Sequence, residues 1–360
     1  MRRFLKKHQA LHIWLGIAGG LGVLFLLLRY VRPVMNFWVF SVALPFRQGM
    51  GRLTGWLRFS VAELIALLLL LTVLGLLVRE IIRIRRNKQS LGGGLYRIVA
   101  GLLAIVVTII SSFSLLYGAN FYADNFQERS GIFAQDATVE DLERVTARFA
   151  AGLNDTAPLV YRDEAGVVAM PIRQMFDESV DVFRPFEGYF PFLTMADRQP
   201  KPLVISPFMA MTDYVGFYFP FTGEANINTR MPRSQMPVTI LHEFAHQRGV
   251  ASENEANFVA ILAGVKGDNP TFAYSAYLMG YNYLANALNR IDPERFRAIH
   301  DTLVDYVHAD LDNIRAYHAQ RNPVAQRVTN AMNDQMLRSY GETSGVQSYG
   351  EVVDLLIVYF

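Results

Sequence analysis

One short segment of the chain combines residues that could hold a metal ion and activate water. Residues 241–258 read LHEFAHQRGVASENEANF. His242 and His246 are four positions apart, so on a helix both imidazoles lie on one face and can bind a single ion. Glu243 follows the first histidine and can serve as a general base toward a water molecule. The pattern predicts a zinc site of the kind used in metal-assisted hydrolysis.

A catalytic zinc takes a third protein ligand and leaves its fourth position to water. Gly249 allows the chain to turn after the first helix, and Ser252 is a good N-cap for a second helix beginning at Glu253. Glu253 is the favoured ligand, because Asn257 lies one turn further on and could orient it by a hydrogen bond. Glu255, in the same acidic turn, is the alternative. The predicted ligands of one Zn²⁺ per chain are His242, His246 and Glu253.

The composition excludes several other classes of protein. The 360 residues include no cysteine, which excludes disulfide frameworks, iron–sulfur clusters and thiol nucleophiles. A formal net charge of +2 gives no reason to expect binding to nucleic acid. Hydrophobic residues make up 52% of the chain and charged residues only 18%, so an apolar excess must be placed somewhere.

Three apolar segments account for that excess. They cover residues 11–28, 59–78 and 98–116, and the second carries one charge, Glu63, near its start. About twenty apolar residues suffice to cross the hydrocarbon core of a bilayer. We therefore expect an all-helical membrane region at residues 1–118 with three transmembrane helices. No small-residue cleavage site follows the first segment, so we expect it to be retained rather than removed as a signal peptide.

Basic residues indicate the orientation of these helices. With three spans, the N-terminus and the second loop share one side of the membrane, and the first loop lies on the other side with five arginines. The shared side carries ten basic residues, namely Arg2, Arg3, Lys6, Lys7, Arg79, Arg83, Arg85, Arg86, Lys88 and Arg97. This excess predicts a cytoplasmic N-terminus and an extracytoplasmic C-terminal domain. The apolar stretch at 34–46 leaves an alternative, because a fourth crossing there would move that domain into the cytoplasm.

The rest of the chain, residues 119–360, has the mixed composition of one globular domain. Thr138 and the acidic residues after it predict the start of a helix. Short apolar runs at 168–172 and 203–205 suggest strands, and VGFYFPF at 215–221 reads as an edge strand interrupted by a proline. From Pro237 onward the pattern is mainly helical. Strands followed by helices predict an α+β domain.

The motifs also resemble known families. HEFAH followed by ENEAN is similar to the gluzincin arrangement, in which HExxH is followed by E-x-x-A-D or E-x-x-A-N. Three segments more closely resemble the domain of unknown function 3810 family, a group of uncharacterised bacterial membrane proteins: GFYFPFTGEANIN at 216–228, the segment at 242–258, and SYGEVVDLL at 348–356. This resemblance implies a zincin-like fold and membrane attachment. Arg248 departs from the general zincin pattern, which has an apolar residue there, and Asn257 stands where many relatives have aspartate.

The combined hypothesis is a membrane-anchored zinc metallopeptidase of the bacterial cell membrane, acting on a peptide or protein substrate. The zincin resemblance implies that the strand at 215–221 lines the cleft and pairs with an extended substrate. The alternative is a catalytically silent zincin scaffold that acts as a membrane sensor or binding module. Four tyrosines offer hydroxyls that could stabilise an oxyanion, although such spacing commonly serves helix packing. They are Tyr274, Tyr277, Tyr281 and Tyr283.

Overall fold

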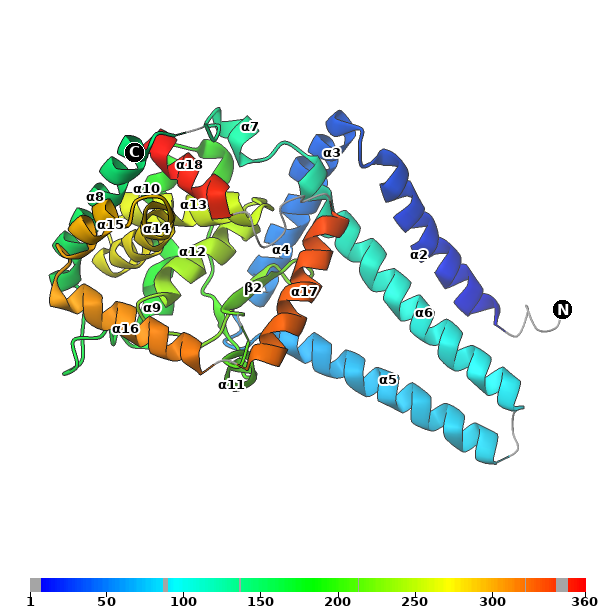
Figure 1. Cartoon of the computed structure of the whole chain (residues 1–360). Helices are drawn as coiled ribbons and strands as arrows, with labels where there is room; N and C mark the ends of the chain where they lie inside the picture. The colour runs from blue at the N-terminus through cyan, green and yellow to red at the C-terminus, as the bar shows by residue number, and fades with distance from the viewer. Residues whose placement is uncertain (1–7, 87–89, 136, 213, 321, 341–348) are drawn as a thin grey trace.

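The structure is a computed structural model that describes residues 8–86, 90–135, 137–212, 214–320, 322–340 and 349–360. Three long helices project from one side of a helical globular domain (Figure 1). Five basic residues used above to predict orientation lie outside the described residues: Arg2, Arg3, Lys6, Lys7 and Lys88.

The three projecting helices are α2 (Gln9–Leu28), α5 (Val61–Arg85) and α6 (Leu91–Leu116), and each is long and apolar enough to cross a membrane. They confirm the three predicted apolar helices and mark a membrane protein. Helices α5 and α6 extend beyond the predicted segments at the end distant from the globular domain. There Glu80 of α5 accepts from Arg83, and lies 3.4 Å from Arg97 of α6. This ion group allows the helices to continue past the apolar segments.

The stretch at 34–46 belongs to a helix that packs on the globular domain. This helix consists of α3 (Arg32–Trp38), a π-helical turn η1 (Val39–Ala43) and α4 (Leu44–Thr54). The Thr54 hydroxyl donates to the carbonyl of Thr222 at 3.0 Å, and a Cβ on Gly51 would lie 3.0 Å from the carbonyl oxygen of Gly223. Among the described residues, the candidate spans are only α2, α5 and α6.

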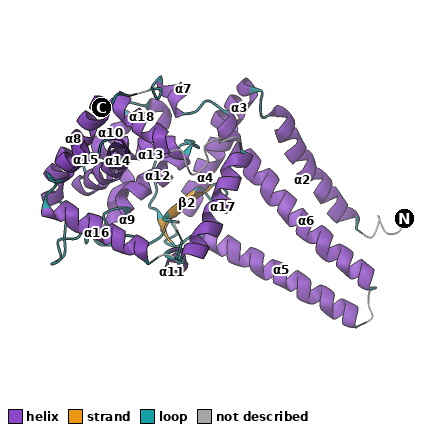
Figure 2. Ribbon diagram, viewed as in Figure 1, coloured by secondary structure: helices purple, strands orange, loops and turns teal. Residues whose placement is uncertain are grey.

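The globular domain is mostly helical with one small sheet (Figure 2). Its α-helices are α7 (Phe126–Ser130), α8 (Val139–Thr156), α9 (Ile172–Glu178), α10 (Arg184–Glu187), α11 (Ser206–Met209), α12 (Met236–Gln247), α13 (Glu253–Lys266), α14 (Pro270–Ile291), α15 (Pro293–His300), α16 (Asp305–Ala319), α17 (Pro323–Ser339) and α18 (Tyr349–Tyr359). Four 3₁₀ turns join them: η2 (Gly118–Tyr122), η3 (Ala157–Leu159), η4 (Ser179–Asp181) and η5 (Pro191–Leu193). The helix predicted at Thr138 is confirmed as α8, since the Thr138 hydroxyl accepts from the Asp141 amide at 3.2 Å.

The sheet has the strand order β1-β3-β2. Strand β1 (Lys201–Pro202) is parallel to β3 (Glu224–Ile227), and β2 (Gly216–Phe219) is antiparallel to β3. The predicted edge strand is confirmed as β2. The other two strand predictions are wrong in extent. Val168 forms only an isolated bridge with Arg162, and residues 203–205 lead into α11, where Pro207 favours a first helical turn.

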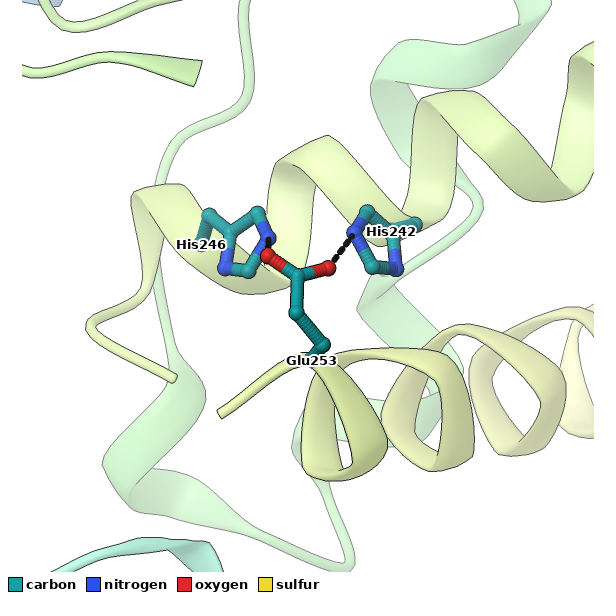
Figure 3. A group of neighbouring side chains, drawn as sticks. All are labelled: His242, His246 and Glu253. Atoms are coloured by element: carbon teal, nitrogen blue, oxygen red, sulfur yellow. Dashed lines mark ion pairs between the residues drawn. The ribbon is translucent and has the colours of Figure 1, made fainter. Parts of the chain in front are cut away.

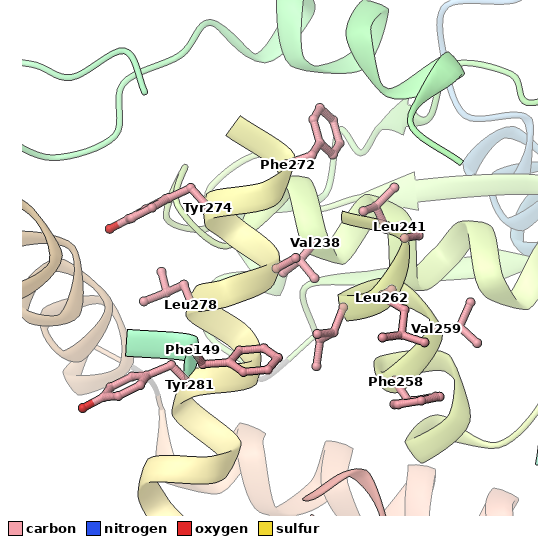
Figure 4. Packing of buried hydrophobic residues seen from close by; sticks show 14 of the residues in the cluster. Phe149, Val238, Leu241, Phe258, Val259, Leu262, Phe272, Tyr274, Leu278 and Tyr281 are labelled. Atoms are coloured by element: carbon pink, nitrogen blue, oxygen red, sulfur yellow. The ribbon is translucent and has the colours of Figure 1, made fainter. Parts of the chain in front are cut away.

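The core is formed where α8 packs against α14 and where α12, α13 and α14 pack together (Figure 4). Gly152 of α8 faces the ring of Tyr277, and Gly280 of α14 faces the ring of Phe149. Each glycine makes room for an aromatic ring of the other helix, so the two helices can approach closely. This packing buries α12 almost completely and fixes the helix that carries the HExxH motif.

Candidate metal centre

Helices α12 and α13 bring His242, His246 and Glu253 together (Figure 3). Their ligand atoms all lie within 4.8 Å of one another. Glu253 lies between the two imidazoles, with one carboxylate oxygen 3.2 Å from Nε2 of His242 and the other 3.6 Å from Nε2 of His246. The turn between the helices depends on Gly249, whose φ of +89° favours glycine.

These separations fit a tetrahedral zinc ion. Zinc bonds to nitrogen and oxygen are about 2.0–2.1 Å long, which places any two ligand atoms of a tetrahedron about 3.4 Å apart. The separations of 3.2 and 3.6 Å, which involve different oxygens of Glu253, are close to that value. The whole ligand set lies within 4.8 Å, so small side-chain movements would bring all three residues onto one ion. The Glu253 side chain is 38% exposed, so one side of the group is open to solvent. Two imidazoles and one carboxylate with an open side are the donor set of a catalytic rather than a structural zinc site.

A hydrogen bond fixes which nitrogen of His246 faces the group. Its Nδ1 lies 2.7 Å from the carbonyl oxygen of Val250, to which it donates, so Nε2 is left to face Glu253. The Tyr117 hydroxyl lies 3.0 Å from the same Nδ1. For His242, Nδ1 is buried without a hydrogen-bond partner among the described residues. Both imidazoles therefore present Nε2 to Glu253. Among the described residues, Nδ1 has a hydrogen-bond partner in His246 but not in His242.

The site attracts positive charge. Burial by itself would raise the pKa of Glu253 and lower that of His246, but their mutual attraction outweighs both effects. As a result the pKa of Glu253 lies far below its usual range, and the pKa of His246 rises to about 9. In the absence of a metal, protonated His246 supplies the positive charge that pairs with the Glu253 carboxylate.

Glu243, the predicted general base, is buried next to the first histidine of the group. Its carboxylate is buried beside strand β2, and a Cβ on Gly216 would lie 3.0 Å from its Oε1. Its Oε2 has no hydrogen-bond partner among the described residues. Burial raises the pKa of Glu243. A raised pKa makes a carboxylate a stronger base than an exposed one, and an oxygen without a hydrogen-bond partner leaves it an accepting atom.

The alternative ligand Glu255 lies elsewhere. It is buried and accepts from the backbone amides of Phe126 and Gln127 at 2.9 and 3.0 Å, so it anchors the first turn of α7. Burial raises its pKa to about 7. Asn257 is placed on α13 as expected, but its amide donates to the Tyr283 hydroxyl at 3.0 Å rather than to a ligand.

The tyrosines of α14 serve packing and hydrogen bonding inside the domain. Tyr274 donates to Asp310 at 2.6 Å, and the hydroxyl of Tyr281 lies 3.1 Å from Nδ1 of His300. Tyr277 packs against Gly152, and Tyr283 accepts from Asn257. The partners of the Tyr274 and Tyr281 hydroxyls lie on α16 and α15, not in the metal-ligand group.

Arg248 ends α12 in a buried ion cluster, although the zincin pattern has an apolar residue there. Its guanidinium bonds both oxygens of Asp197 at 2.7 and 2.9 Å and one oxygen of Glu187 at 2.9 Å. It also stacks 3.9 Å from the ring centre of Phe183. The Arg248 side chain is 1% exposed, and its planar guanidinium donates hydrogen bonds to both carboxylates. This cluster fixes the end of the helix immediately after His246.

Sequence reasoning missed three residues that surround the site. They are Tyr117, which follows α6, Arg47 on α4 and Tyr218 on β2. The Arg47 guanidinium lies 5.4 Å from the ring centre of Tyr117 and 5.8 Å from that of Tyr218. Arg47 is fully buried and donates to the side-chain oxygen of Asn120 at 3.1 Å. Tyr117 and Arg47 are more than a hundred residues from the motif in sequence, and no local pattern connects them to it.

The comparisons with known proteins agree with the resemblance noted above. A family model described as protein of unknown function (DUF3810) matches residues 41–357. The chain belongs to this family. A search of curated proteins and of solved structures finds no match. The family match covers α4, α5, α6 and the domain that carries the metal-ligand group.

Proposed function

For this member of the DUF3810 family, we propose the function of a membrane-anchored zinc metallopeptidase that hydrolyses peptide bonds. The observation that carries the proposal is the convergence of His242, His246 and Glu253 beside the buried carboxylate of Glu243. A purely structural metal site has no need of a base next to its first ligand. The proposed fold of the domain is zincin-like, with α12 as the active-site helix and β2 as the neighbouring edge strand.

The roles of the residues follow from their positions. Zinc held by His242, His246 and Glu253 would supply a Lewis acid at the open side of the group. Glu243 takes the proton of the attacking water and delivers it to the leaving amine. His246 is held in its binding tautomer by the Val250 carbonyl. The outer edge of β2 is unpaired among the described strands, so an extended peptide can add to the sheet there.

We further propose that the domain lies outside the cytoplasm. Helices α2, α5 and α6 are three candidate spans, and an odd number of crossings puts the N-terminus and the domain on opposite sides of the membrane. The excess of basic residues on the N-terminal side favours the cytoplasm for that side. The site is then on the extracytoplasmic face of the bacterial cell membrane.

The test is metal content combined with peptide hydrolysis by the purified full chain. We expect about one zinc per chain, lost in His246→Ala and kept in Glu243→Gln. A mixed peptide library should be cut by the native protein and left intact by Glu243→Gln. Zinc binding without any difference between native protein and Glu243→Gln would instead favour the silent scaffold that senses or binds a partner. A folded native chain without zinc would contradict both the metal site and the peptidase.

A further inference from the structure

The candidate metal site is attached directly to the ends of the membrane-spanning helices. Tyr117 immediately follows the last residue of α6, and its hydroxyl reaches Nδ1 of His246 at 3.0 Å. Ser60 immediately precedes α5, and its hydroxyl donates to the side-chain oxygen of Asn226 in β3 at 2.6 Å. One side chain therefore separates the end of α6 from a ligand, and one separates the start of α5 from the sheet. Figure 1 shows both helices leaving the domain on this side.

Further contacts hold the sheet at the same level. The carboxylate of Glu224, in β3, accepts from the backbone amides of Val61 and Ala62 at 3.4 and 3.1 Å. Glu63 accepts from the amides of Val204 and Ile205 at 3.0 Å each. The first turn of α5 thus fixes both β3 and the loop before α11. These parts of the domain therefore lie at the level of the first turn of α5.

Several large apolar side chains near this junction are exposed although they lie outside the spans. Trp56 is 78% exposed, Val204 81% and Phe208 67%. Large apolar side chains exposed at successive positions near a span are typical of a surface that another phase covers, and tryptophan is enriched at the membrane–water boundary. Because these residues lie between the spans or beside α11, the bilayer interface is the phase that fits. That interface is about 5–8 Å thick on each side of the hydrocarbon core.

From this position we propose that the substrates are polypeptides anchored in or on the membrane, cut in the segment adjacent to the anchor. The inference rests on the proposed peptidase function and specifies its substrate class. An anchored segment is delivered to a site in the headgroup layer at high effective concentration, whereas a soluble chain must first partition there. Water adds across the peptide bond, leaving a carboxyl terminus on one fragment and an amino terminus on the other. An extended chain advances about 3.3 Å per residue, so about two or three residues cross the headgroup interface, and cuts are expected within the first few residues after the anchor.

The depth of the site can be measured without any assay of activity. The chain has no cysteine, so single cysteines can be introduced and labelled with a fluorophore in the full-length protein. Phe208→Cys places the label at the junction. Tyr161→Cys is the control, because Tyr161 is an aromatic residue exposed to the same extent. Its neighbour Arg162 pairs with Asp310 of α16. In nanodiscs containing headgroup-nitroxide lipids, the label at 208 should be quenched several-fold more than that at 161. Equal quenching at both positions would overturn the inference.

The substrate class is tested with two peptide libraries of identical mixed sequence, one joined to a single transmembrane anchor and one soluble. The zinc-loaded full chain is studied in nanodiscs, with Glu243→Gln as the background. We expect the anchored library to be cut at least tenfold faster, with the cuts clustered near the anchor by mass spectrometry. Equal rates with cuts spread evenly would refute the substrate class while the peptidase function stands. If neither library is cut above the Glu243→Gln background, the peptidase function fails, and this inference fails with it.

Discussion

The substitution Gly216→Ala tests whether Glu243 is held where a general base must be. Gly216 is the first residue of β2 and is not among the glycines with positive φ, so alanine is compatible with the backbone. Its Cβ would lie 2.9 Å from the carbonyl oxygen of Asn226 and 3.0 Å from Oε1 of Glu243. The Asn226 carbonyl belongs to the paired strand β3 and yields less easily than a carboxylate at the end of a side chain. The substitution should therefore displace the carboxylate of Glu243.

The size of the effect follows from the distance. Ordinary contacts of a Cβ begin at 3.4 Å, so the Glu243 oxygen must move by about 0.4 Å. A misplacement of about 1 Å at a reacting group costs roughly a hundredfold in rate, so this displacement should cost about sixfold in kcat/KM if the logarithm of the rate scales with distance. Sixfold corresponds to about 1 kcal/mol of transition-state stabilisation. Zinc content should stay at the native value, because Glu243 is not one of the predicted ligands.

The assay is cleavage of the anchored library by the full chain in nanodiscs, together with metal analysis of the same sample. Gly188→Ala is the matched control, since its Cβ would meet only the carbonyl oxygen of Pro185 at an ordinary 3.5 Å. The control should keep native activity and native zinc content. Unchanged kcat/KM in Gly216→Ala, with the protein folded and zinc bound, would refute the assignment of Glu243 as the base beside β2.

Three further predictions concern the metal and the helix that carries it. Glu253→Gln should abolish stoichiometric zinc. Glu255→Gln should keep zinc but lose about 1–3 kcal/mol of stability, because glutamine has one accepting oxygen for the two buried amides of α7 that Glu255 accepts from. Metal analysis and thermal unfolding distinguish the two. Arg248→Met should lower the free energy of unfolding by about 3–5 kcal/mol, because it leaves the buried carboxylate of Asp197 without its partner. Much of this loss should be recovered in the double variant with Asp197→Leu. Additive losses in the double-mutant cycle would contradict a coupled buried pair. With free zinc at about a thousand times its Kd, binding stabilises the folded chain by about 4 kcal/mol, so a chelator should lower Tm and added zinc should restore it. A chelator effect of the same size on His246→Ala would argue against this site.

The parts of the site that could be predicted from sequence lie within about a dozen consecutive residues. The interval between His242 and His246, the turn at Gly249 and the helix beginning at Glu253 are local, and helix geometry fixes their relation. The same holds for the three apolar helices and for the cap at Thr138. The preference for Glu253 over Glu255 relied on Asn257, one turn further along the helix, but the Asn257 amide donates to Tyr283. The structure gives a different reason, because Glu255 is occupied by the amides of α7.

The parts that could not be predicted depend on contacts between distant segments. Tyr117 touches His246 across 129 positions of sequence. Arg248 looks misplaced in sequence because its acceptors, Glu187 and Asp197, lie 61 and 51 positions away. The run at 203–205 has the composition of a strand, but the helical start at Pro207 and the anchoring of its amides by Glu63 override that preference.

The membrane region contributes to the electrostatics of the candidate site as well as to its location. Arg47 is fully buried, two of its nitrogens have no hydrogen-bond partner, and no carboxylate lies within ion-pair distance among the described residues. A buried guanidinium is costly unless nearby negative charge offsets it, and the carboxylates of Glu243 and Glu253 belong to the same buried surroundings as the Tyr117 ring beneath it. Arg47 and the two carboxylates therefore act with opposite sign on the pKa of the same side chain, that of Tyr117. A fragment beginning at residue 119 would keep the three ligands and the base, yet it would lose Arg47 and Tyr117. We therefore expect the candidate site to keep its surroundings only in the full chain.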